Sequence, residues 1–195
     1  VHVAFDEATA ILAGDALLTH AFALLAEGYA AQPTLAHALI RELADAAGSR
    51  RLIGGQMEDV LAEKKSDATP EELEFIHLNK TAAMIEAALV MGGLLGGERP
   101  GPTLTQLRRA GRHLGLAFQI IDDILDATAD TATLGKTAGK DAKADKTTFV
   151  KLHGLEASRR FAAELSTAAR AALATLPGDK SFLFALITAM AARSN

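Results

Sequence analysis

Apolar residues recur every three to four positions along most of the chain, the spacing that places them on one face of an α-helix. Glycines and prolines fall between the apolar segments, where helices are expected to end. We expect about six to eight helices packed as a bundle, in an all-α fold that forms a single domain over residues 1–195. The predicted helices cover residues 3–30, 35–47, 52–64, 70–95, 103–127, 155–176 and 182–192.

The first predicted helix has almost no polar face, because alanine, leucine and isoleucine occur around its whole circumference. A helix that is apolar on all sides is normally buried by its neighbours, so we expect other helices to enclose this one. The most membrane-like stretch, residues 82–97, is too short to cross a bilayer and contains Glu86. It predicts a buried core helix, and we expect no membrane span.

Composition supports the fold class and narrows the function. Hydrophobic residues make up 49% of the chain, which excludes a disordered protein. Alanine and leucine are abundant, whereas there is one tyrosine and no tryptophan, and this balance favours helices over strands. A formal net charge of −4 gives no reason to expect nucleic acid as a partner. The absence of cysteine excludes disulfides and thiolate metal sites and fits a cytoplasmic location.

One stretch concentrates the candidate chemistry. Asp122, Asp123 and Asp126 lie close together near the end of the helix predicted over 103–127, among apolar residues that bury most of it. Asp122 and Asp126 are one turn apart on one face, and Gln119 adds an amide one turn earlier. Carboxylates held this close repel one another, and a bound cation removes that conflict. Mg²⁺ prefers oxygen ligands and is the expected ion. A solvated helix end carrying clustered acids is the alternative.

Basic residues occur in two places where they could meet an anion. Lys80, followed by Thr81, directly precedes an apolar run and should emerge at the edge of the core. There it either contacts an anionic substrate or extends into water. The irregular segment 128–148 contains Lys136 and Lys146. A loop of this length in a compact domain is more often functional than a passive linker, and a basic loop after an acidic cluster suits phosphate capture.

Two adjacent glycines, Gly54 and Gly55, lie inside a predicted helix. Each costs about 1 kcal/mol of helix stability relative to alanine. The pair therefore needs a physical reason, such as the close approach of a neighbouring helix or of a substrate.

Taken together, these segments resemble the trans-isoprenyl diphosphate synthases, the polyprenyl synthetase family. The resemblance is to short-chain members that make farnesyl or geranylgeranyl diphosphate. A lone DDxxD would be a weak match, but here several motifs follow one another in the order that the family has. The matching segments are residues 10–18, Gly54-Gly55-Gln56 with Asp59, residues 77–81, residues 118–126, and the run over 135–155.

The resemblance implies an isoprenoid-synthase-like helical bundle and a Mg²⁺-dependent prenyltransferase that condenses an allylic diphosphate with isopentenyl diphosphate. Asp122, Asp123 and Asp126 would hold the metal that bridges to the allylic diphosphate. Family members commonly dimerise, so a homodimer is expected. The resemblance also implies catalytic roles for Lys80 and Lys136, and substrate binding by Lys80, Thr81, Gln119, Lys136 and Lys146.

The sequence departs from the family pattern at its start. The family's first aspartate-rich motif, the arginine pair after it and the basic motif for isopentenyl diphosphate are not among the 195 residues. The resemblance covers the C-terminal two-thirds of a prenyltransferase domain, so we expect this chain alone not to be catalytically competent. A catalytically inactive homologue serving as a regulatory or scaffolding subunit is the alternative. A terpene cyclase fits less well, because Lys80-Thr81 and the lysines over 136–146 resemble those of chain-elongating enzymes.

Overall fold

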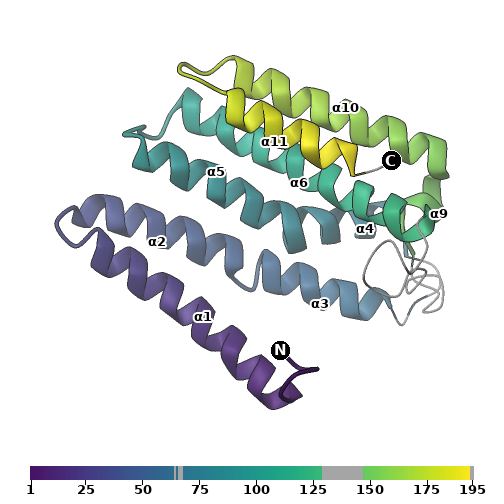
Figure 1. The fold of residues 1–195 in the computed structure, drawn as a ribbon, viewed down its shortest axis with the longest axis horizontal. Coiled ribbons are helices and arrows are strands. Elements are labelled where there is room, and N and C mark those ends of the chain that lie inside the picture. Colours follow the sequence, from purple (N-terminus) through teal and green to yellow (C-terminus); the bar gives the residue numbers. More distant parts are fainter. Residues whose placement is uncertain (64, 66–67, 129–146, 194–195) are drawn as a thin grey trace. The chain divides into compact units, whose positions relative to one another are not determined.

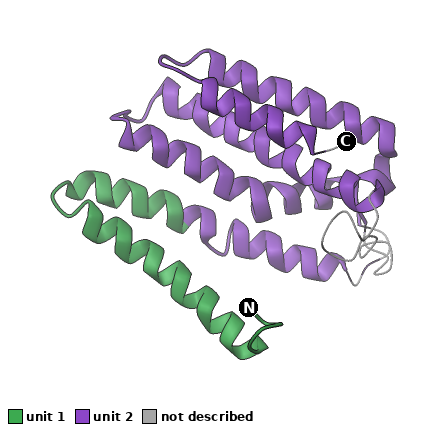
Figure 2. Ribbon diagram, viewed as in Figure 1, with its two compact units in different colours: residues 1–44 green, residues 45–195 purple. Residues whose placement is uncertain are grey.

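The computed structural model describes residues 1–63, 65, 68–128 and 147–193, and every regular element in those residues is helical. The all-α prediction is therefore confirmed for the described part of the chain. The chain divides into two compact units, residues 1–44 and residues 45–195 (Figure 2). The prediction of a single domain over residues 1–195 stays a prediction.

The first unit contains α1 (Glu7–Gly28) and the first part of α2 (Pro33–Ala47). Asp6 caps α1 by accepting a hydrogen bond from the Thr9 backbone N–H at 2.8 Å. The expectation that this helix is enclosed is wrong, because α1 has no buried residue. Within its own unit α1 has only the start of α2 as a helical neighbour, and one helix cannot cover a circumference that is apolar all round. Its exposed apolar residues include Ile11, Leu12, Leu17, Leu18 and Leu24.

The second unit is built around α6, the longest helix of the described chain (Figure 1). Helix α6 contacts five other elements, namely α5, the π-helix η1, α9, α10 and α11. Its inward face is almost wholly buried, as the apolar pattern predicts. The bounds are α3 (Leu52–Ala62), α4 (Pro70–Ile76), η1 (His77–Ala82), α5 (Ala83–Leu95), α6 (Pro102–Thr128), α9 (Phe149–His153), α10 (Leu155–Ala174) and α11 (Ser181–Ala192).

Two glycines allow α6 to cross its neighbours at very short range. A Cβ atom added at Gly111 would lie 2.5 Å from the Cα of Glu86, and one added at Gly115 would collide with Ala82. The backbones of α6 and of the η1–α5 segment are therefore in direct contact.

One apolar core joins α5, α6, α10 and α11, and a second joins α6, α9 and α10. The first includes Val90, Leu107, Leu114, Leu173 and Ile187, and the second includes Ile120, Ile121, Ile124 and Ala162.

Helix α4 begins where the sequence predicts. The Thr69 hydroxyl accepts a hydrogen bond from the Glu72 backbone N–H at 3.2 Å, and the Glu72 carboxylate accepts one from the Thr69 backbone N–H at 2.9 Å. This reciprocal capping box satisfies two amide groups that would otherwise have no helical partner. It fixes the start of the continuous helical stretch that leads into η1.

Two helical stretches are long and apolar enough to cross a membrane when judged by length and composition alone, namely Glu7–Gly28 and Pro70–Leu95. Core helices of soluble proteins meet the same criterion. The second stretch carries Lys80 and Glu86, and both side chains form ion pairs with residues of α3 or its N-terminal flank. These pairs are typical of a helix packed inside a protein.

Candidate functional site

A polar cavity of about 200 Å³ lies where α3, α4, η1 and α6 meet in the second unit. It brings together residues that are far apart in the sequence, and it includes five of the residues that the sequence predicts for the site. Those five are Lys80, Thr81, Gln119, Asp122 and Asp123, and the remaining lining residues are Asp59, Leu73, Ile76, His77 and Thr147.

The wall that carries Lys80 and Thr81 is a π-helix, η1 (His77–Ala82). The sequence predicts one unbroken α-helix over residues 70–95, and this is the main local difference from that prediction. A π-helix is closed by i→i+5 hydrogen bonds, whereas an α-helix is closed by i→i+4 hydrogen bonds, and π-helical segments occur frequently at functional sites. Apolar periodicity carries too little information over six residues to reveal it.

Lys80 is held in place by a buried carboxylate. Its Nζ donates to the Oδ2 atom of Asp59 at 2.6 Å, and the Asp59 residue is only 4% exposed. Gly55 makes this contact possible, because a Cβ atom added there would collide with the backbone N of Lys80. Gly55 therefore allows the close approach of α3 to η1, which is one of the two physical reasons expected for the glycine pair. Asp59 belongs to the same motif, but its role as the partner of Lys80 emerges only from the fold.

Asp123 links the acidic stretch to the segment that follows it. One of its carboxylate oxygens accepts a hydrogen bond from the Phe149 backbone N–H at 2.7 Å. That amide lies at the first turn of α9, where helix N–H groups have no helical partner. The same oxygen lies 3.9 Å from Nε2 of the buried His77. Asp123 therefore joins α6, η1 and α9 at one side of the cavity.

The donor set of the cavity suits a hard divalent cation. Asp122 and Asp123 offer carboxylate oxygens, Gln119 an amide oxygen and Thr81 a hydroxyl. The described residues contain no cluster of three or more His, Asp or Glu side chains arranged to hold a metal ion. Mg²⁺ does not require such a cage, because it usually binds one or two carboxylates and keeps waters or substrate phosphates as its other ligands. The oxygen ligands present therefore fit Mg²⁺.

Three predicted site residues are not among the lining residues. Asp126 lies within α6 and does not line the cavity. Lys136 and Lys146 lie outside the described residues. Thr147, the next residue along the chain, is 6% exposed and does line the cavity.

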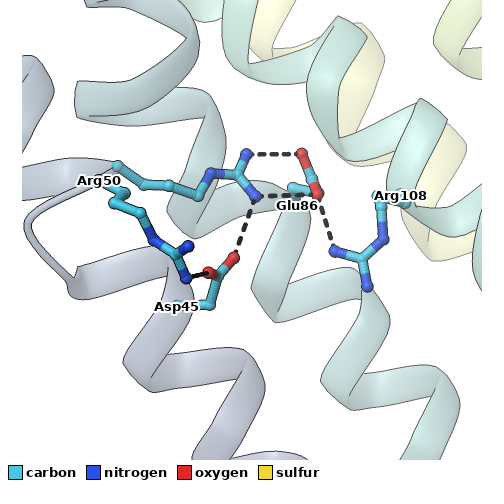
Figure 3. A network of polar contacts seen from close by, with 5 residues as sticks. Asp45, Arg50, Glu86 and Arg108 are labelled. Carbon is cyan, nitrogen blue, oxygen red and sulfur yellow. Dashed lines mark hydrogen bonds and ion pairs between the residues drawn. The ribbon is translucent and has the colours of Figure 1, made fainter.

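A second charge network fixes the other end of α3 (Figure 3). Both oxygens of the buried Glu86 accept hydrogen bonds from Arg51, at 3.1 and 2.9 Å, and Arg108 donates to the same carboxylate at 2.8 Å. Burial raises the pKa of Glu86, but the two guanidinium groups lower it by more, so the net shift is downward. Arg51 also lies 3.8 Å from Asp45.

These two sets of ion pairs run along the same contact. Arg51 at the start of α3 binds Glu86, and Asp59 near its end binds Lys80, so α3 runs antiparallel to the η1–α5 segment. The position of α3 along the η1–α5 segment is therefore fixed at both ends.

Comparison with known proteins identifies the class that this fold and this cavity define. Residues 1–176 match the polyprenyl synthetase family, and the chain belongs to that family. It is 43% identical over 198 residues to the chloroplastic geranylgeranyl pyrophosphate synthase of Catharanthus roseus. That match covers 100% of this chain and 55% of the Catharanthus protein. It is 44% identical over 200 residues to large subunit 1 of the heterodimeric, chloroplastic geranylgeranyl pyrophosphate synthase of Arabidopsis thaliana. That match covers 100% of this chain and 54% of the Arabidopsis subunit.

The fold also matches solved structures of this class of enzyme. A Helicobacter pylori geranyltransferase, crystallised with magnesium and isoprenyl diphosphate, matches with a TM-score of 0.83 and 35% sequence identity. The match covers 97% of this chain and 61% of that one. The prediction of an isoprenoid-synthase-like helical fold is thus confirmed. The chain spans about half the length of the curated relatives that it matches.

Proposed function

We propose that this chain carries the diphosphate-binding half of a Mg²⁺-dependent prenyltransferase that joins an allylic diphosphate to isopentenyl diphosphate. The observation that carries the proposal is the polar cavity in which Lys80, Thr81, Gln119, Asp122 and Asp123 converge. It combines one cationic donor with a set of oxygen ligands. That combination suits a diphosphate and its metal ion.

The reaction breaks the bond between the allylic carbon and the diphosphate oxygen, and the diphosphate leaves with the electron pair. The double bond of isopentenyl diphosphate then forms the new carbon–carbon bond, and a proton is lost to the released diphosphate. Asp122 and Asp123 would hold Mg²⁺, which would supply positive charge to the departing diphosphate. Charge stabilisation in a partly buried site is the main contribution expected of the protein.

The residues of the chain orient that leaving group. Lys80 donates hydrogen bonds to the diphosphate while Asp59 keeps its ammonium group at the cavity wall. The Thr81 hydroxyl and the Gln119 amide offer neutral hydrogen bonds from the two facing walls. The η1 segment and α6 are in backbone contact at Gly115, so these groups are held on rigid elements before the substrate arrives.

Names of the relatives support a short-chain product of farnesyl or geranylgeranyl length. The plant relatives are called geranylgeranyl pyrophosphate synthases, and the solved Helicobacter pylori relative is called a geranyltransferase.

The test supplies Mg²⁺, isopentenyl diphosphate and one allylic diphosphate at a time, and measures the length of the prenyl product. Because we expect this chain alone not to turn over, the assay includes a fusion to the preceding segment of the Catharanthus roseus relative. Product from the fusion supports the proposal, and substrate recovered intact from both counts against it.

The second candidate is a catalytically inactive homologue that acts as a regulatory or scaffolding subunit. One relative is the large subunit of a heterodimeric enzyme, and α1 exposes apolar residues that suit a partner helix. We propose a homodimer that uses this surface, and sedimentation of the chain with and without Leu17→Glu tests it.

The cytoplasmic location stays a prediction, because the plant relatives are chloroplastic by name. Fractionation of the source cells would decide it.

A further inference from the structure

A second cavity in the described part of the chain, of about 460 Å³, is lined by α4, η1, α6, α9 and α10. Its volume falls in the range of about 300–1,000 Å³ that is typical of small-molecule sites. It is distinct from the polar cavity, and the two share only His77 among their lining residues. The site proposed above for the diphosphate does not use it.

The floor of this second cavity is apolar and aromatic. Leu116, Ile120 and Leu165 contribute aliphatic surface. Phe149 packs against His153 with ring centroids 4.4 Å apart and against Phe161 in an edge-to-face arrangement at 5.5 Å. The Phe149 backbone N–H is bound by Asp123, so this ring is anchored to α6. Such a surface takes an apolar ligand body and presents π-faces to any charge that the ligand carries.

The charged side chains at the cavity are both acidic. Glu74 from α4 and Glu164 from α10 are exposed residues among its lining. Arg160 lies 3.9 Å from Glu164 and 5.9 Å from the Phe161 ring centroid, and both side chains of that ion pair are largely exposed. An exposed pair at this distance is weak, so Glu164 keeps most of its negative potential.

These features select the charge of the ligand. Two exposed carboxylates in the lining repel a phosphate or diphosphate head group and attract an ammonium group. Aromatic rings next to carboxylates are also the usual surroundings of bound organic cations. We propose that this cavity binds a small organic monocation, with an apolar body that fills the aromatic floor and an ammonium group that pairs with the carboxylates of the lining, Glu74 and Glu164. The two cavities would then have opposite charge preferences on either side of His77.

The test measures the binding of three matched probes to the full chain by isothermal titration calorimetry, without Mg²⁺ or any isoprenoid. The probes are 4-phenylbutylammonium, 4-phenylbutanol and 4-phenylbutyl phosphate, which share one apolar body. The ammonium is expected to bind about tenfold more tightly than the alcohol, and the phosphate more weakly than either. Equal affinities, tighter binding of the phosphate, or no binding of the ammonium would overturn the proposal.

Variants locate the site. The double substitution Glu74→Gln/Glu164→Gln should remove the preference for the ammonium and leave the affinity for the alcohol unchanged. The control Glu27→Gln/Glu156→Gln changes the net charge equally at exposed positions outside the cavity and should keep the preference. Ala168→Trp fills the cavity and should abolish binding of both probes, with folding checked by circular dichroism. A preference that survives in the first variant would contradict the assignment. Because the readout is binding of an amine, its failure leaves the proposed prenyltransferase function untouched, and the reverse also holds.

Discussion

The ammonium group of Lys80 and the buried carboxylate of Asp59 form an ion pair at 2.6 Å, with Lys80 on the π-helix η1 and Asp59 on α3. The two side chains are unequally exposed, at 31% for Lys80 and 5% for Asp59. Both residues line the polar cavity, and the cation of the pair is the more exposed partner. A lysine held in this way offers directed hydrogen bonds to a bound anion with little loss of side-chain entropy.

We predict that these two residues are energetically coupled. Lys80→Met removes the donor from a buried carboxylate, so it should lower the free energy of unfolding by about 1–3 kcal/mol. Lys80→Met combined with Asp59→Asn should lose less than the sum of the single variants, by about 1–2 kcal/mol. Urea unfolding of the four proteins measures this cycle.

The exposed pair between Lys65 and Glu72 provides the matched control. Its atoms are 2.9 Å apart, but the side chains are 48% and 42% exposed. Its coupling energy should be no more than about 0.5 kcal/mol, because solvent screens it. Strict additivity of the Lys80 and Asp59 substitutions would contradict the role given to this pair.

Gly55→Ala should destabilise the protein and displace Lys80. The added methyl group would meet the backbone N of Lys80, which cannot move aside as a flexible side chain can. A loss of about 1–3 kcal/mol in unfolding free energy is expected. The control is Gly92→Ala in α5, where nothing lies within 4 Å of the added Cβ. That change should be neutral or stabilising by up to about 1 kcal/mol. Thermal unfolding compares the two, and equal melting temperatures would contradict the close approach of α3 to η1.

The stability of the chain should fall on acidification because of Glu86. Burial raises its pKa, but Arg51 and Arg108 lower it by more, so the folded-state pKa lies below the ordinary value of 4.5. Ionised Glu86 therefore contributes stability above pH 4.5, and this contribution is lost as the pH falls through the lowered pKa. Glu86→Gln should cost about 1–3 kcal/mol at neutral pH and progressively less in acid.

Urea midpoints measured between neutral and strongly acidic pH check this prediction. The exposed Glu58 provides the control, since Glu58→Gln should follow the wild-type curve throughout. A wild-type curve and a Glu86→Gln curve separated by a constant amount at every pH would show that the carboxylate of Glu86 is not the titrating group.

Sequence reasoning reached most of the fold because the long helices are strongly periodic and have clear start and stop residues. Thr69 and Pro70 mark the start of α4, and apolar positions along α6 predict its burial. It failed at α1, because an apolar circumference indicates that something should cover a helix without indicating what does. It also missed α9, a five-residue helix capped by Thr148 that is too short for a periodic pattern.

At the site, too, some features could be predicted from the sequence and others could not. The acidic stretch, Lys80 and Gly55 can be selected from residue chemistry and spacing. The partner of Lys80 cannot, because Asp59 is twenty-one positions away and meets it only through the crossing of two helices. The π-helix could not be predicted either, because apolar periodicity over its six residues does not distinguish it from an α-helix.

We propose that the polar cavity binds Mg²⁺ and a diphosphate through Asp122 and its neighbours. Isothermal titration of this chain with inorganic pyrophosphate, in the presence of Mg²⁺ and again with a chelator, tests it most directly. We predict that Mg²⁺ strengthens pyrophosphate binding, that Asp122→Asn weakens the Mg²⁺-dependent binding about tenfold or more, and that Glu58→Gln leaves it unchanged. Pyrophosphate binding that is the same with and without Mg²⁺, or the same in wild type and Asp122→Asn, would contradict the account.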